Sequence, residues 1–216
     1  MRNRGAQLIK SVFNTDNFLM RIAEKIFDLA SLNLLFLLSC LPLVTIGIAK
    51  MSLYQSLFAI KKGRRVSVLK TYLGALRKNW KRGLQVGSLE LLVVFLCLLN
   101  LLLFRKIEDL PFQLIKVLSI AVLVFMTILF LYAYPLAARY QMSFQGLAQA
   151  SMLMASLHFL GSFAMVGLLG VILFLASWSV LSFLLLSLLF FLIGFAGLAF
   201  LQLKFLEPIL EKYGQE

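Results

Sequence analysis

The chain has 216 residues, of which 62% are apolar and only 14% are charged, and its mean hydropathy is strongly positive. Soluble domains average about 45–50% apolar and about 25% charged residues, so this composition excludes an ordinary water-soluble domain. Because a membrane-spanning helix needs roughly 20 apolar residues, we predict an all-α, polytopic integral membrane helix bundle with about five apolar segments and amphipathic surface helices.

The net charge of +12 does not indicate nucleic-acid binding, because the 21 Lys and Arg residues cluster beside apolar segments. This distribution is typical of cytoplasmic loops that face an anionic leaflet. We therefore expect a lipid bilayer with anionic headgroups as a partner, and no nucleic acid.

Residues 1–27 form the first predicted element. Leu8, Val12, Leu19, Ile22 and Ile26 recur at helical spacings among charged residues, which indicates an amphipathic helix at the membrane surface. We expect an interruption of this helix around residues 14–17. The remaining residues, 28–216, are predicted to form a single transmembrane domain.

The first apolar segment, residues 29–49, contains a backbone break. Pro42 removes a helical donor and clashes with the preceding turn, so the helix should kink or stop there. Thr45 is placed to satisfy freed backbone groups, and Gly47 follows it. Two topologies remain open: a single span, or a re-entrant pair that enters over 29–41 and leaves over 47–60. The side of the N-terminus stays open with them.

Residues 50–83 carry ten Lys and Arg residues and no acid, which predicts a basic loop on the cytoplasmic side. Within this loop an apolar stripe indicates a second surface helix. The stripe consists of Val66, Leu69, Leu73, Leu76 and Trp80.

Further apolar runs complete the count of segments, and we expect a cytoplasmic C-terminus. These runs cover residues 84–104, 117–134, 159–176 and 181–203. The last two are separated only by residues 177–180, which predicts a helical hairpin. Their glycines are expected to permit close helix approach. These glycines are Gly161, Gly167, Gly170, Gly194 and Gly197.

Few side chains in the apolar segments carry chemistry. Glu90 is an intramembrane acid, expected either to pair with Lys or Arg from the basic loop or to act in transport or coupling. Asn33 and Asn100 are predicted to donate interhelical hydrogen bonds. His158 is the only histidine, and no nucleophile, base or metal set is visible. We predict no enzyme, no cofactor and no metal site.

Three stretches resemble the YesL family of small bacterial membrane proteins, a domain of unknown function. They are CLPLVTIGIAKMSLY (40–54), YLGALRKNWK (72–81) and YPLAARY (134–140), and the resemblance extends over roughly residues 16–200. Members are typically encoded beside carbohydrate ABC importers. The resemblance thus implies a multi-pass protein of the bacterial cell membrane that assists sugar uptake.

The predicted function is a non-catalytic membrane accessory or scaffold subunit that contacts the permease subunits of a carbohydrate ABC importer. The alternatives are an autonomous small-solute transporter or channel, and a membrane regulator of sugar uptake. Pro42, Thr45 and Gly47 are expected to shape the broken first segment. The predicted cytoplasmic docking or headgroup face consists of Arg64, Arg65, Arg77, Lys78, Asn79, Trp80 and Arg139.

Overall fold

The computed structural model describes the backbone of residues 3–61 and 67–213, and the side chains of residues 20, 22–61 and 67–207. In this part of the chain the regular structure is entirely helical. The helices are α1 (Asn3–Ser39), α2 (Ile46–Lys61), α3 (Val68–Leu103), α4 (Leu110–Arg139), α5 (Phe144–Leu157), α6 (Phe159–Trp178), α7 (Val180–Leu189) and α8 (Phe195–Tyr213).

Five helical stretches in the described ranges are long and apolar enough to cross a membrane. They are Leu43–Lys61, Val68–Leu103, Leu110–Arg139, Phe159–Trp178 and Val180–Glu207. Most of their large apolar side chains lie on the outside of the protein, where lipid and not water is the expected neighbour. The predicted fold class, an all-α polytopic membrane bundle with five apolar segments, is confirmed.

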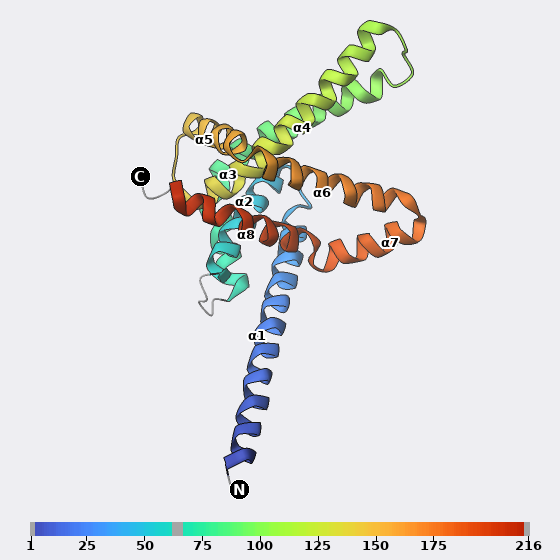
Figure 1. The fold of residues 1–216 in the computed structure, drawn as a ribbon. Helices are drawn as coiled ribbons and strands as arrows, with labels where there is room; N and C mark the ends of the chain where they lie inside the picture. Colours follow the sequence, from blue (N-terminus) through green and yellow to red (C-terminus); the bar gives the residue numbers. More distant parts are fainter. Residues whose placement is uncertain (1–2, 62–66, 214–216) are drawn as a thin grey trace.

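The helices radiate from a central core made by α2 with the adjoining parts of α1, α3, α4, α5 and α8 (Figure 1). Tyr72, Leu57 and Leu136 are among its fully buried side chains. The α3–α4 hairpin and the α6–α7 hairpin project from this core, and α1 projects as one long helix. The short α6–α7 turn is stabilised by Ser179, whose hydroxyl accepts a hydrogen bond from the Leu181 amide.

The N-terminal helix differs from its predicted form. Helix α1 is continuous over 37 residues, so the interruption expected at residues 14–17 is wrong. Asn and Asp are poor helix formers, but their cost of under about 1 kcal/mol each is too small to end a long helix. The helix also passes the expected boundary at residue 27 without a break.

The predicted backbone break is present just after α1. The chain leaves the helix at Cys40 and forms a 3₁₀ turn, Leu43–Thr45, before α2 begins. Pro42 precedes this turn in an extended conformation, as expected of a residue that cannot continue a helix. From the break, α2 runs back toward the side on which α1 begins (Figure 1). The re-entrant alternative predicts this return of the chain toward the side on which it began.

Helix α3 joins two segments that the sequence analysis kept apart. The range 50–83, predicted as a loop with a separate surface helix, is helical over residues 50–61 and 68–83. The span expected to start at residue 84 is the second half of the same 36-residue helix. Nothing between Lys81 and Gln85 stops a helix except Gly83, and a single glycine costs only about 1 kcal/mol.

Three glycines allow α2 and α3 to cross in backbone contact. A Cβ atom on Gly87 would lie 2.6 Å from the Cα atom of Gly47, and one on Gly83 would lie 2.6 Å from the Cα atom of Ile48. A methyl group on Gly47 would overlap the backbone of both facing glycines. Only glycine fits at this crossing.

The close approach expected of the glycines in the last two segments is wrong for four of them. Cβ atoms added to Gly161, Gly167, Gly170 and Gly197 meet nothing within 4 Å, and the three atoms nearest to one added to Gly194 belong to the Phe190 side chain of the same turn. Few residues on the outer surfaces of the α6–α7 hairpin contact another helix. Spacing alone did not distinguish packing glycines from glycines that face outward.

Asn33 joins α1 to a π-helical turn, Phe190–Gly194, that lies between α7 and α8. Its amide nitrogen donates to the carbonyl oxygens of Phe190 at 2.9 Å and Phe191 at 2.8 Å, and its oxygen accepts from the amide of Ala196 at 3.0 Å. The π turn leaves backbone groups without helical partners, and this fully buried side chain supplies them. The Asn100 side chain makes no interhelical bond within the described residues.

The glycine crossing predicts opposite effects of alanine at two positions in α3. Gly87→Ala should destabilise the protein by about 1–3 kcal/mol, because a methyl group overlaps the α2 backbone. Gly74→Ala, a change on the same helix with open space around it, should be neutral or stabilising by up to about 1 kcal/mol. Thermal unfolding of the two variants in detergent checks this, and an equal melting temperature would contradict it.

The asparagines provide a second matched pair. Asn33→Leu should lower stability by about 2–3 kcal/mol, since it removes one acceptor and two donors from a buried site. Asn100→Leu should change stability by less than about 0.5 kcal/mol. The melting temperatures in one detergent provide the comparison. Equal losses for the two variants would show that the bonds to the π turn contribute nothing special.

Candidate functional site

An ion pair with a tyrosine lies where α2, α3 and α4 meet in the core. The Lys50 Nζ atom is 2.6 Å from one carboxylate oxygen of Glu90, and the Tyr134 hydroxyl donates to the other at 2.5 Å. The Lys50 ammonium also lies 5.1 Å from the centre of the Tyr134 ring. The side chain of Glu90 keeps 16% of its surface exposed, and that of Lys50 keeps 32%. We call these three residues the Glu90 cluster.

The glycine crossing brings this cluster together. Lys50 lies three residues after Gly47 on α2, and Glu90 lies three residues after Gly87 on α3. Because α2 and α3 run in opposite directions here, Lys50 and Glu90 lie on opposite sides of the glycine contact, and their long side chains reach across it to form the ion pair. A carboxylate in an apolar segment is costly to bury without a partner of opposite charge. The ion pair therefore neutralises both charges inside the protein.

A second set of polar groups continues beside this cluster. The Tyr54 hydroxyl donates to the side-chain oxygen of Gln202 at 2.5 Å, and the Gln202 amide donates to the Leu131 carbonyl at 2.5 Å. Tyr54 and Gln202 are both buried. These bonds tie α2 to α8 and α4, and they satisfy groups that would otherwise be costly to bury.

Thr45 stabilises the broken first segment through two backbone carbonyls. Its hydroxyl donates to the Ser39 oxygen at 2.5 Å, which the end of α1 leaves without a helical partner, and to the Pro42 oxygen at 2.7 Å, which also accepts from the Thr45 amide. Pro42 is exposed, whereas Gly47 is buried against α3. These three residues thus lie in one short stretch but have three different environments.

The structure places the described residues of the predicted docking face in different environments. Arg77 and Trp80 are exposed, but Asn79 is buried and its amide donates to the Gln55 side chain at 2.5 Å. Arg139 lies over the Phe58 ring, with its guanidinium carbon 5.7 Å from the ring centre. Arg64 and Arg65 lie outside the described residues.

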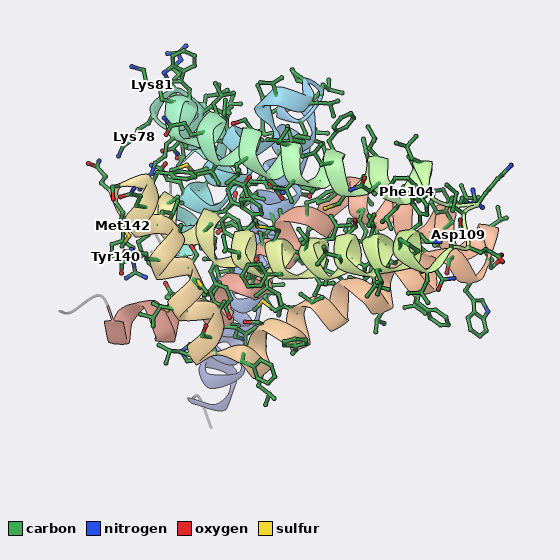
Figure 2. All side chains as sticks on the ribbon, turned by 90° about the horizontal axis from the view of Figure 1, so that it is seen from above. Lys78, Lys81, Phe104, Asp109, Tyr140 and Met142 are labelled. Atoms are coloured by element: carbon green, nitrogen blue, oxygen red, sulfur yellow. The ribbon has the colours of Figure 1, made fainter. Side chains whose placement is uncertain are left out.

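A polar groove of about 490 Å³ lies at one end of the α3–α4 hairpin, between α2, α3 and the connection from α4 to α5. Figure 2 shows Lys78 and Lys81 on α3 at this end, with Tyr140 and Met142 across from them and the tip with Phe104 and Asp109 far away. We call it the basic groove. Its cationic side chains are those of Lys78, Lys81, Arg82 and Arg139.

Arg82 closes one side of the basic groove and was not singled out from the sequence. Its guanidinium donates to the carbonyl of Tyr140 at 2.9 Å and to the carbonyl of Met142. These bonds attach the α4–α5 connection to α3. The sequence signal for Arg82 is its position as the last cation before a long apolar run.

The expected pairing of Glu90 with a cation of residues 50–83 is confirmed, but Lys50 was not singled out among the ten and Tyr134 was missed, although the pattern contained a signal. Glu90 is the only acid between Asp28 and Glu108, and Lys50 is the only cation between Lys25 and Lys61. Two lone opposite charges in adjoining apolar segments predict each other as partners. Among the described residues, no three His, Cys, Asp or Glu side chains gather in a way that could hold a metal ion.

Comparison with protein families gave one match. Residues 29–101 match the family described as "Protein of unknown function, DUF624". This region covers the end of α1, the break, α2 and nearly all of α3, and so contains the glycine crossing and the Lys50–Glu90 pair. Neither the comparison with curated proteins nor that with solved structures gave a match.

The ion pair predicts a specific pattern of single and double variants. Glu90→Gln should lower stability by about 2 kcal/mol, because it leaves the Lys50 charge without its partner in a partly buried place. The double variant Lys50→Met with Glu90→Leu should recover most of that loss, since it removes both charges at once. Melting temperatures of the three proteins in detergent check this. A double variant less stable than Glu90→Gln would contradict it.

Proposed function

We propose that this protein is a non-catalytic accessory or scaffold subunit of the bacterial cell membrane, associated with the permease subunits of a carbohydrate ABC importer. The observation that carries the proposal is an apolar stripe on the first half of α3. Leu69, Leu73 and Trp80 are about half exposed there, at 53%, 46% and 56%, while a neighbouring face of the helix is buried in the core. We call these three residues the outer stripe.

Lipid chains cannot cover the start of this stripe. Helix α3 has 36 residues and is about 54 Å long, whereas the hydrocarbon layer is about 30 Å thick. With Leu103 at the far boundary, even a tilt of 40° leaves about the first ten residues of α3 outside the hydrocarbon. Leu69 and Leu73 are among these residues. An exposed apolar stripe outside the hydrocarbon is typical of a protein contact.

The charges beside the outer stripe are of the kind expected on the cytoplasmic side of the membrane. Lys70 and Arg77 are exposed on the same half of α3, and no acid lies between residues 50 and 83. Lys and Arg of this kind are enriched in segments that stay in the cytoplasm. The permease subunits of an ABC importer also have a cytoplasmic side, so the outer stripe is suitably placed to contact one of them.

The choice of a carbohydrate importer rests on the resemblance to the YesL family, whose members are typically encoded beside such importers. The match of residues 29–101 to DUF624 covers the part of the chain that contains the outer stripe. That family description names no function, so the partner is inferred from the resemblance and the geometry together.

The test is affinity purification of the native protein in mild detergent, followed by mass spectrometry of the proteins that remain after a salt wash. Recovery of importer permeases in near-stoichiometric amounts supports the proposal. Leu69→Gln with Leu73→Gln should lower that recovery about tenfold or more, because two partly exposed leucines together account for about 1.5–3 kcal/mol of apolar burial.

The control for this experiment changes two cations in the connection at the other end of the α3–α4 hairpin. Arg105→Gln with Lys106→Gln lies at the α3–α4 tip and should leave recovery unchanged, since the tip is far from the outer stripe (Figure 2). Both double variants must elute as the unmodified protein does on gel filtration. Full recovery of permeases with the leucine variant would refute docking through the stripe.

A second candidate function, an autonomous small-solute transporter, is favoured by one observation. The Glu90 cluster and the Tyr54–Gln202 bonds form adjoining polar groups in the core, and such groups mark solute or proton pathways in many transporters. Lys50→Met with Glu90→Leu separates the two functions. A stable variant that loses solute uptake in vesicles containing this protein alone would favour the transporter.

A further inference from the structure

The basic groove has an unusual charge balance for a polar cavity. Among the residues that the structure describes, four cationic side chains line it and no Asp or Glu side chain does. The nearest acid on α3 is Glu90, which is already paired with Lys50. Positive charges gathered around a cavity without a counter-charge repel each other, so an anion bound among them stabilises the protein.

The four cations have different roles in the groove. Arg82 holds the α4–α5 connection through two carbonyl oxygens, and Arg139 stacks on the rings of Phe58 and Tyr140. Lys78 and Lys81 make no ion pair or hydrogen bond within the described residues. The two arginines therefore build the wall, and the two lysines supply ammonium groups that are available to a ligand.

Backbone donors add to the cationic groups. Helix α5 has 14 residues and begins at Phe144, beside the groove, with Ser143 as its N-cap. The Ser143 side chain accepts from the Gly146 amide, so the amides of Phe144 and Gln145 keep no partner inside the helix. The positive end of this helix lies at the edge of the same cavity.

The depth of the groove indicates which anion reaches it. Residues 82–103 of α3 form a helix about 33 Å long, which is close to the thickness of the hydrocarbon layer. With Leu103 at the far boundary, Lys78 and Lys81 lie at the level of the phospholipid headgroups. Trp80, which lies between them in the sequence but on another face of the helix, is exposed, as is typical of tryptophan at the membrane interface.

We propose that the basic groove binds the phosphate group of an anionic phospholipid, with Lys78 and Lys81 as its direct cationic partners. Arg82 and Arg139 position the wall, and the α5 amides face the same phosphate. This inference concerns a lipid and does not depend on the importer partner. A free phosphorylated solute has the same phosphate chemistry, so the experiment must distinguish the two sources.

The test is native mass spectrometry of the full chain in a neutral detergent, titrated with phosphatidylglycerol and, separately, with phosphatidylcholine. We expect one tightly bound phosphatidylglycerol that phosphatidylcholine does not replace. Lys78→Gln with Lys81→Gln should weaken this binding about thirtyfold, because each cation at a membrane surface contributes about 1 kcal/mol, or roughly fivefold in affinity. Lys78→Arg with Lys81→Arg should retain it, which also shows that the site folds.

The matched control removes the same charge from the same helix outside the groove. Lys70→Gln with Arg77→Gln should weaken binding by less than about threefold, since neither residue lines the cavity. Equal losses in the two glutamine variants would mean diffuse attraction and would overturn the proposal. So would equal retention of the two lipids, or tight binding of glycerol phosphate or inorganic phosphate with no preference for phosphatidylglycerol.

Discussion

The backbone contact between α2 and α3 is the constraint on which the rest of the core depends. Gly47, Gly83 and Gly87 let the two helices approach until no side chain fits between them. Helices in a membrane gain no hydrophobic driving force from each other, so close packing and interhelical hydrogen bonds must hold them. The crossing provides the packing. It also fixes the register in which Lys50 meets Glu90 and Gln55 meets Asn79.

The polar bonds in the core follow from this register and from the two backbone irregularities. At the break after α1, the Thr45 hydroxyl bonds to the Ser39 and Pro42 carbonyls, and at the π turn Asn33 bonds to backbone groups from another helix. Irregular backbone inside a membrane protein is tolerated where protein groups replace the missing bonds. In each irregular stretch one side chain therefore supplies hydrogen bonds to the backbone, and neither stretch requires a water-filled space.

The sequence predicted the features that depend on composition and on single strong residues. The number of apolar segments follows from the need for about 20 apolar residues per span, although the first candidate span is Leu43–Lys61 and not residues 29–49, and the break follows from Pro42. It did not predict that α3 is continuous, because a change from basic to apolar side chains alters the surroundings of a helix without ending it. The contacts at Gly47 and around the basic groove depend on segments far apart in the chain, and glycine spacing on one segment carries no information about the helix that faces it.

The first half of α3 has two faces whose chemistry differs. Its outer stripe is apolar and lies partly beyond the hydrocarbon, so a protein surface is the occupant that removes it from water. The basic groove, behind the same stretch of helix, is cationic and lies at headgroup depth, so an anion is the occupant that lowers its repulsion. Because Arg82 ties this stretch to the α4–α5 connection, a phosphate in the groove would hold the end of the hairpin in place. A lipid bound on one face would thereby orient the stripe on the other face toward its protein partner.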